Sequence, residues 1–116
     1  MNEIDRSILR EIRSRLGPSG AYEVFDTDLI VLINSAFDRL CQLGIGPLSP
    51  FRISGENETW DDFIPEENRQ ALIHDYVYLS VKLIFDPPQN SGALNTFKEQ
   101  IQKYEYLLKE TAQFGY

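Results

Sequence analysis

The sequence has very few of the residues that build metal sites and disulfide bonds. It contains one cysteine, Cys41, and one histidine, His74, among 116 residues. A single cysteine cannot form an internal disulfide bond, and a single histidine cannot build a multi-histidine metal site. We therefore expect no metal and no cofactor, and the composition excludes a zinc enzyme.

Long hydrophobic runs are also missing. No stretch approaches the roughly 18 apolar residues that a membrane span needs, and residues 1–5 alternate charged and aliphatic side chains, unlike a signal peptide. We expect no membrane association, and a protein that is made in, and stays in, a reducing cytoplasm or a particle assembled there.

Basic residues are scarce relative to acidic ones. Eleven Lys and Arg against eighteen Asp and Glu give a net charge of -7, and the excess acid lies between residues 21 and 91. Such a field repels nucleic acid, which argues against a general DNA-binding protein. The remaining composition, 42% hydrophobic and 12% aromatic, is ordinary for a globular domain of this length.

Apolar residues recur at helical spacing in four segments, with glycine and proline between them. Helices are predicted at about residues 3–16, 28–43, 66–85 and 92–111, with a tail at 112–116. Gly44 is the expected terminator of the second helix. The third helix is apolar over most of its circumference, which is typical of a central helix or of one that contacts a second molecule.

The connection between the second and third predicted helices, residues 44–63, is long for a helical bundle. It holds too many apolar side chains for a disordered linker, and residues 51–55 fit a short strand and turn, or a β-hairpin. The sequence therefore predicts an all-α fold. It is a single domain over residues 1–116, a compact bundle of about four helices with this long ordered loop.

Three arginines, Arg6, Arg10 and Arg13, line one side of the first predicted helix. They could face the acidic middle of a neighbouring copy, so that head-to-tail contacts close into a ring. The simpler alternative is a solvated helix face. A phosphate site is weaker still, because three basic residues give little affinity in so acidic a molecule.

The long loop carries a cluster of acids. Four carboxylates within seven residues could hold a divalent cation, but the order of an EF-hand loop is absent, so a solvated acidic loop is favoured. These acids are Glu56, Glu58, Asp61 and Asp62.

His74 lies beside Asp75, and this pair could act as a general base. No serine, cysteine or second acid is placed by the sequence to complete a mechanism, so a structural or surface histidine is favoured. Cys41 falls on the apolar stripe of its helix, where a small buried hydrophobe is expected. We predict no catalytic residues and no enzyme.

Aromatic residues outside the regular stripes are candidates for contacts. Trp60 in the loop either pins the loop to its own core, the favoured role, or anchors a partner. For Phe114 and Tyr116 a partner contact and a loose end are equally consistent with the pattern. Phe85 lies off the main stripe of the third helix. The candidate interface residues are therefore Arg6, Arg10, Arg13, Trp60, Phe85, Phe114 and Tyr116.

Several stretches resemble the small head-to-tail connector (adaptor, head-completion) proteins of long-tailed bacteriophages. The resemblance covers most of residues 26–110, and its Trp-Asp-Asp-Phe and Phe-Asp-Pro-Pro elements are distinctive. The stretches are Leu32-Ile33-Asn34-Ser35-Ala36-Phe37, Gln42-Leu43-Gly44-Ile45-Gly46-Pro47, Glu58-Thr59-Trp60-Asp61-Asp62-Phe63-Ile64, Tyr76-Val77-Tyr78-Leu79, Leu83-Ile84-Phe85-Asp86-Pro87-Pro88 and Lys98-Glu99-Gln100-Ile101.

The resemblance implies a structural virion protein of the head-tail neck, assembled in the bacterial host cytoplasm. Members of such a family form a twelvefold ring of copies of themselves beneath the portal protein, extend the DNA channel and dock the next connector or tail-terminator protein. Genomic DNA passes through without specific binding, and Glu56, Glu58, Asp61 and Asp62 are candidates for repelling its phosphates. The resemblance implies no catalytic residues.

Two interpretations from other classes stay open. A small helical regulatory module that binds a protein partner would share this composition and would stay a monomer or dimer. An enzyme that uses His74 with Asp75 is the more remote alternative.

Overall fold

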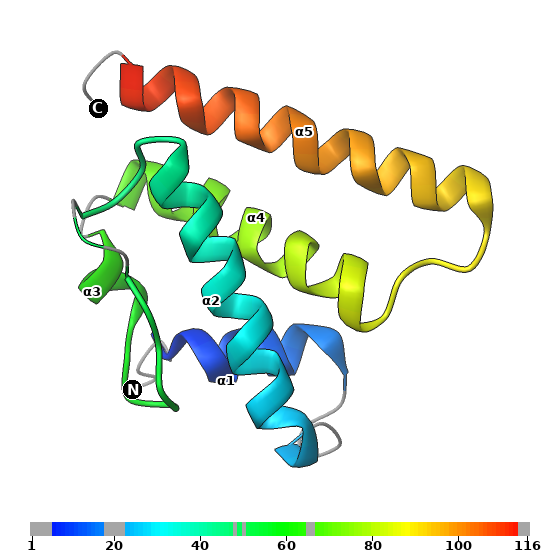
Figure 1. The fold of residues 1–116 in the computed structure, drawn as a ribbon, viewed down its shortest axis with the longest axis horizontal. Helices are drawn as coiled ribbons and strands as arrows, with labels where there is room; N and C mark the ends of the chain where they lie inside the picture. Colours follow the sequence, from blue (N-terminus) through cyan, green and yellow to red (C-terminus); the bar gives the residue numbers. More distant parts are fainter. Residues whose placement is uncertain (1–5, 18–22, 48, 50, 65–66, 114–116) are drawn as a thin grey trace, which may run out of the picture.

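The computed structural model describes residues 6–17, 23–47, 49, 51–64 and 67–113. The predicted all-α fold is confirmed, because helices make up most of the described chain and no strand occurs within it (Figure 1). The elements are α1 (Ile8–Leu16), the 3-10 turn η1 (Glu23–Phe25), α2 (Asp26–Gln42), the short α3 (Trp60–Phe63), α4 (Glu67–Phe85) and α5 (Ser91–Gln113).

The first helix begins later than predicted. Ser7 is extended and caps α1, since its hydroxyl accepts the backbone N–H of Arg10 at 3.3 Å. The chain before the cap pairs instead with the long loop: the N–H of Trp60 donates to the carbonyl of Arg6 at 3.1 Å, and Ser7 and Thr59 form an isolated antiparallel bridge. The predicted start near residue 3 is thus wrong for Arg6 and Ser7, and residues 3–5 lie outside the described part.

The second helix ends where expected. The N–H of Gly44 donates to the carbonyl of Cys41 at 3.0 Å, and that of Ile45 donates to Leu40 at 2.9 Å. This pair of bonds is a Schellman motif, which requires the left-handed backbone that Gly44 adopts with φ +84°. Cys41 itself is half-buried, so it is less buried than expected.

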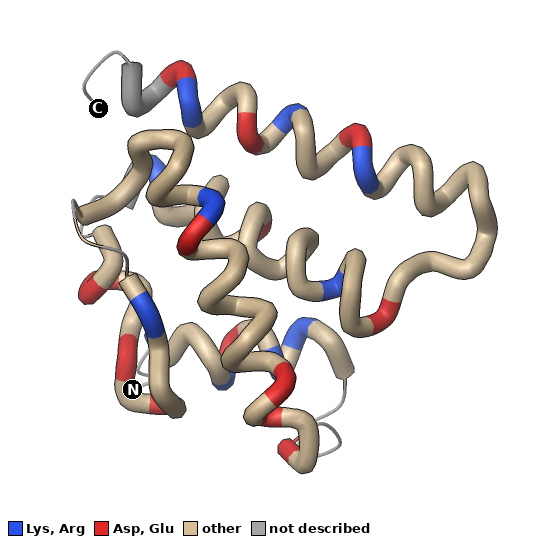
Figure 2. Tube along the Cα trace, viewed as in Figure 1, with Lys and Arg blue, Asp and Glu red and all other residues tan. Residues whose placement is uncertain are grey.

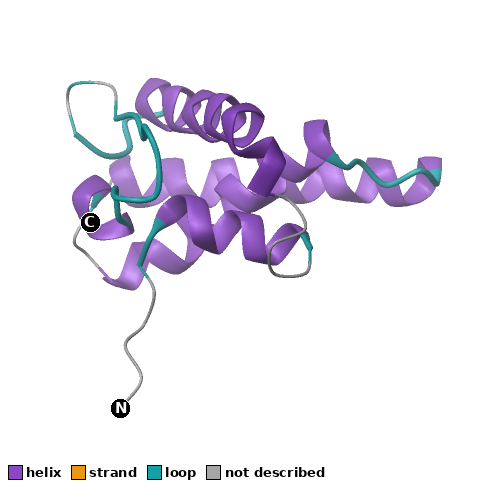
Figure 3. Ribbon diagram, turned by 90° about the horizontal axis from the view of Figure 1, so that it is seen from below, coloured by secondary structure: helices purple, strands orange, loops and turns teal. Residues whose placement is uncertain are grey.

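The third predicted helix, α4, is the central helix of the bundle. It packs against α1, α2 and α5, with α5 running antiparallel along it (Figures 1 and 3). This position explains its wide apolar surface, because Ile73, Val77 and Val81 are all fully buried. In contrast, no side chain in residues 91–100, the first half of α5, is buried, and Leu108 in the second half is fully buried.

The long loop is ordered by side chains, without a strand. Residues 51–55 form no strand or hairpin, so that prediction is wrong. The reason is Asn34 on α2: its amide oxygen accepts the N–H of Ile53 at 2.8 Å, and its nitrogen donates to the carbonyl of Ile53 at 3.0 Å. A single buried amide therefore satisfies the backbone groups that a neighbouring strand would have paired.

The loop then packs its aromatic residues on α2. The rings of Phe51 and Phe63 lie 5.0 Å and 4.6 Å from that of Phe37. Gly46, with φ +93°, fits against Phe63 so closely that a β-carbon there would lie 2.4 Å from the ring.

Within the described ranges, no helix combines the length and apolar character needed to cross a bilayer.

Candidate functional site

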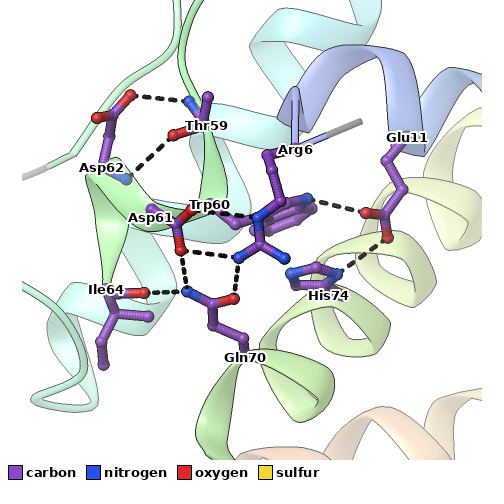
Figure 4. A network of polar contacts seen from close by, with 9 residues as sticks. All are labelled: Arg6, Glu11, Thr59, Trp60, Asp61, Asp62, Ile64, Gln70 and His74. Atoms are coloured by element: carbon purple, nitrogen blue, oxygen red, sulfur yellow. Dashed lines mark hydrogen bonds and ion pairs between the residues drawn. The ribbon is translucent and has the colours of Figure 1, made fainter. Parts of the chain in front are cut away.

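Trp60 is the centre of a network that ties the loop to α1 and α4 (Figure 4). Its side chain is fully buried, and its indole N–H donates to Glu11 Oε1 at 3.0 Å. The indole also stacks on the ring of His74, with centroids 3.9 Å apart and planes 22° apart. Trp60 therefore holds the loop to its own core, the first of the two roles considered for it.

His74 has a different acidic neighbour from the one its sequence position suggested. Its Nδ1 lies 3.1 Å from Glu11 Oε2, whereas the adjacent Asp75 pairs with Arg15 at 3.0 Å. Burial opposes ionisation of Glu11, but the hydrogen bonds from His74 and Trp60 outweigh it and lower the pKa of Glu11. The recorded contacts of His74 are thus a carboxylate and an indole face, and neither is a nucleophile that a base could activate.

Arg6 and Gln70 surround Asp61 from two sides. Arg6 makes a two-point contact, with its Nη2 2.8 Å from Asp61 Oδ1 and its Nε 3.1 Å from Oδ2, and Gln70 Nε2 donates to Oδ1 at 2.9 Å. Gln70 is buried and also bonds Arg6 and the carbonyl of Ile64. Arg6, followed by Gln70, lowers the pKa of Asp61. The segment before α1 is thereby fastened to the start of α4.

Arg10 and Arg13 contact acids of the same chain. Glu56 bridges them, with one oxygen 3.1 Å from Arg10 and the other 2.7 Å from Arg13. Arg13 is mostly buried and also binds both oxygens of Asp26 at 2.9 Å, which joins α1 to the start of α2. The hydrogen bond from Arg13 is the main cause that lowers the pKa of Glu56. Contacts of these arginines with a neighbouring copy stay a prediction.

The other two loop acids bond to the backbone and side chains near them. Glu58 accepts the hydroxyl of Ser54 at 2.7 Å, and Asp62 accepts the N–H of Thr59 at 2.9 Å in a capping box. Figure 2 shows the acids of the loop near the basic residues of α1. Within the described chain, no group of three or more His, Cys, Asp or Glu residues is placed to hold a metal ion.

A groove of about 240 Å³ lies where α2, α4 and α5 meet. Its apolar walls come from Leu32, Leu83, Ile84 and Ile101, and we call it the α2–α4–α5 groove. Ile84 is 65% exposed at its edge. Ile84 is therefore accessible to a second molecule at this edge of the groove.

Polar residues line the groove as well, and three of them, Arg39, Tyr76 and Glu105, contact one another. The hydroxyl of Tyr76 donates to Glu105 Oε2 at 2.7 Å, and Arg39 Nη2 lies 3.1 Å from Glu105 Oε1. Burial, reinforced by Glu105, raises the pKa of Tyr76. These three side chains satisfy one another, so this polar cluster does not require a ligand.

Phe85 lies at the end of α4, and its ring packs edge-on against that of Phe25 at 5.4 Å between centroids. Phe114 and Tyr116 lie outside the described residues.

A family model described as phage connector protein matches residues 8–114, nearly the whole chain. The chain belongs to the phage connector protein family. No curated protein and no solved structure matches it. As a phage connector it is a component of the virion that interacts with other virion components, and its family is a structural one.

Sequence reasoning identified the charged side chains of this connector but did not pair them. It missed Glu11, Gln70 and Asn34, which hold the loop and the N-terminal segment, and it missed the exposed Ile84. The only local signal for the groove was the width of the apolar surface on α4, which extends past what the bundle covers.

Proposed function

We propose that the chain is the subunit of a head-tail connector ring, a homo-oligomer of twelve copies that docks beneath the portal protein. The ring extends the DNA channel and presents a surface to the next connector or tail-terminator protein. The observation that carries this proposal is the match to the phage connector family over residues 8–114. It is supported by the α2–α4–α5 groove with the exposed Ile84 at its edge, which offers a site where a side chain of a neighbouring copy can pack.

The charge distribution supports a role beside DNA without affinity for it. We infer that the loop of Glu56, Glu58, Asp61 and Asp62 lines the channel and repels phosphates. Two of these loop acids are paired with arginines outside the loop. Arg10 and Arg13 of α1 offset the negative charge of Glu56, and Arg6 offsets that of Asp61. The repulsion therefore rests mainly on Glu58 and Asp62, for which the described chain shows hydrogen bonds and no ion pair.

The ring is tested by imaging and mass measurement of the purified protein, alone and with the portal protein of the same phage. We expect rings of about twelve copies on the portal. A stable monomer or dimer that never joins the portal would refute the proposal and support a regulatory module that binds another protein.

The channel role is tested separately. Replacing Asp62 by Lys in the phage should slow genome release, since it puts a cation where a repulsive acid is proposed. The matched control is Asp62→Asn, which removes the charge without adding an attractive one. Unchanged ejection kinetics for the lysine variant would refute the channel-lining role and leave the ring itself untouched.

A further inference from the structure

The most exposed large apolar side chain in the described structure is Val24, at 83%. It lies in η1, which continues directly into α2, and the neighbouring Phe25 packs against Phe85. The turn therefore holds Val24 in a defined position above the surface. Glu23 beside it lies 3.9 Å from Arg13 Nη2 of the same chain, but its side chain is still 62% exposed and can be reached by a second cation. We call Glu23 and Val24 the η1 knob.

The α2–α4–α5 groove has matching properties. At about 240 Å³ it is smaller than the roughly 300–1,000 Å³ typical of small-molecule sites, and its size suits one or two protein side chains. Lys98 lies on the same face of α5 as Ile101 and Glu105, one and two turns away. It is exposed, and no ion pair is recorded for it within the described part of the chain. The groove thus combines apolar walls and a self-paired polar cluster with an exposed cation beside it.

A knob and a groove at different places on one chain are complementary surfaces. When each copy offers both, contacts run head to tail and close into a ring or continue as a filament. We propose that the η1 knob of one copy inserts into the α2–α4–α5 groove of a second copy. Val24 packs against Ile84 and Ile101, and Glu23 faces Lys98. This inference rests on the proposed ring and names the surfaces that make its lateral contact.

Two substitutions test the contact from its two sides. Val24→Asp spoils the knob and Ile84→Asp spoils the groove, and both side chains are exposed enough for the fold to survive. Each should weaken self-association about tenfold or more, because it puts an unpaired carboxylate into an apolar contact. Tyr106→Asp is the matched control: Tyr106 is 61% exposed on α5 and does not line the groove, so this change should leave association intact.

Mixing the two variants gives the sharper readout. A Val24→Asp copy retains its groove and an Ile84→Asp copy retains its knob, so the mixture should form 1:1 dimers that neither variant forms alone and that cannot grow into rings. Sedimentation velocity on the full chain measures this, with circular dichroism as the check on folding.

The outcomes separate this inference from the proposed function. Rings of normal size from Val24→Asp, or a mixture with no heterodimer, would overturn the knob-in-groove contact and leave the connector ring standing. Wild-type protein that forms no ring, alone or on the portal, would overturn the proposed function itself.

Discussion

Replacing Trp60 by Ala tests whether this residue belongs to the core or serves as an anchor for a partner. A buried aromatic side chain removes roughly 150–250 Å² from water, worth about 4–6 kcal/mol at about 25 cal/mol per Å². Trp60 is 0% exposed, so most of this area applies to it. Since alanine keeps a methyl group and the site partly relaxes, we expect a loss of about 3–5 kcal/mol in the free energy of unfolding.

That loss is large compared with the total stability of a domain, about 5–15 kcal/mol. The melting temperature should fall by on the order of 10–20 °C. Trp60→Phe separates the two parts of the effect, because it keeps an aromatic ring but removes the N–H that donates to Glu11. We expect it to cost about 2 kcal/mol, since Glu11 retains its contacts with His74 and Arg15.

Urea unfolding followed by far-UV circular dichroism is the suitable assay, because Trp60 is the only tryptophan and its fluorescence disappears with it. Tyr106→Ala serves as the control, as an exposed aromatic whose loss should change stability by no more than about 0.5 kcal/mol. A Trp60→Ala variant that loses less than about 1 kcal/mol would refute the core role and restore the partner-anchor interpretation.

Other contacts of the loop and of α1 lead to three further predictions. Folding lowers the pKa of Glu11 and Glu56 below their ordinary 4.5. The stability that these two ionised carboxylates give the folded protein is therefore fully present above pH 4.5 and is lost as the pH falls through the lowered pKa values. A urea midpoint that stays constant from neutral pH down to about 3 would contradict this. Gly44→Ala should lower the free energy of unfolding by about 1 kcal/mol, because Gly44 has a positive φ. Gly46→Ala should lower it by more, because Gly46 has a positive φ and also lies against the ring of Phe63. Equal losses by thermal melting would count against this close fit. Asn34→Leu should lower the free energy of unfolding by about 2–4 kcal/mol, because it leaves the N–H and the carbonyl of Ile53 unpaired. Hydrogen exchange at the Ile53 N–H should become faster. Unchanged exchange would show that the Asn34 side chain is not what orders the loop.

The sequence by itself determined the local features of this protein. Each of these features can be recognised within a few neighbouring residues. The helical spacing of apolar residues predicted the helical fold, Gly44 predicted the end of α2, and the wide apolar surface of the third helix predicted the central place of α4. The structure confirms all three. These features depend on backbone geometry that repeats every few residues, so they need no knowledge of what lies opposite.

Only the tertiary structure decided which side chains of the chain contact one another. Arg13 meets Glu56 across 43 residues of sequence and Trp60 meets Glu11 across 49, and nothing in the spacing of either pair indicates the other. The pairing depends on how α1, α2, α4 and the loop pack, which is a property of the whole core. The same packing decides which apolar side chains stay uncovered, and so places Val24 and Ile84 at the surface while Trp60 is buried.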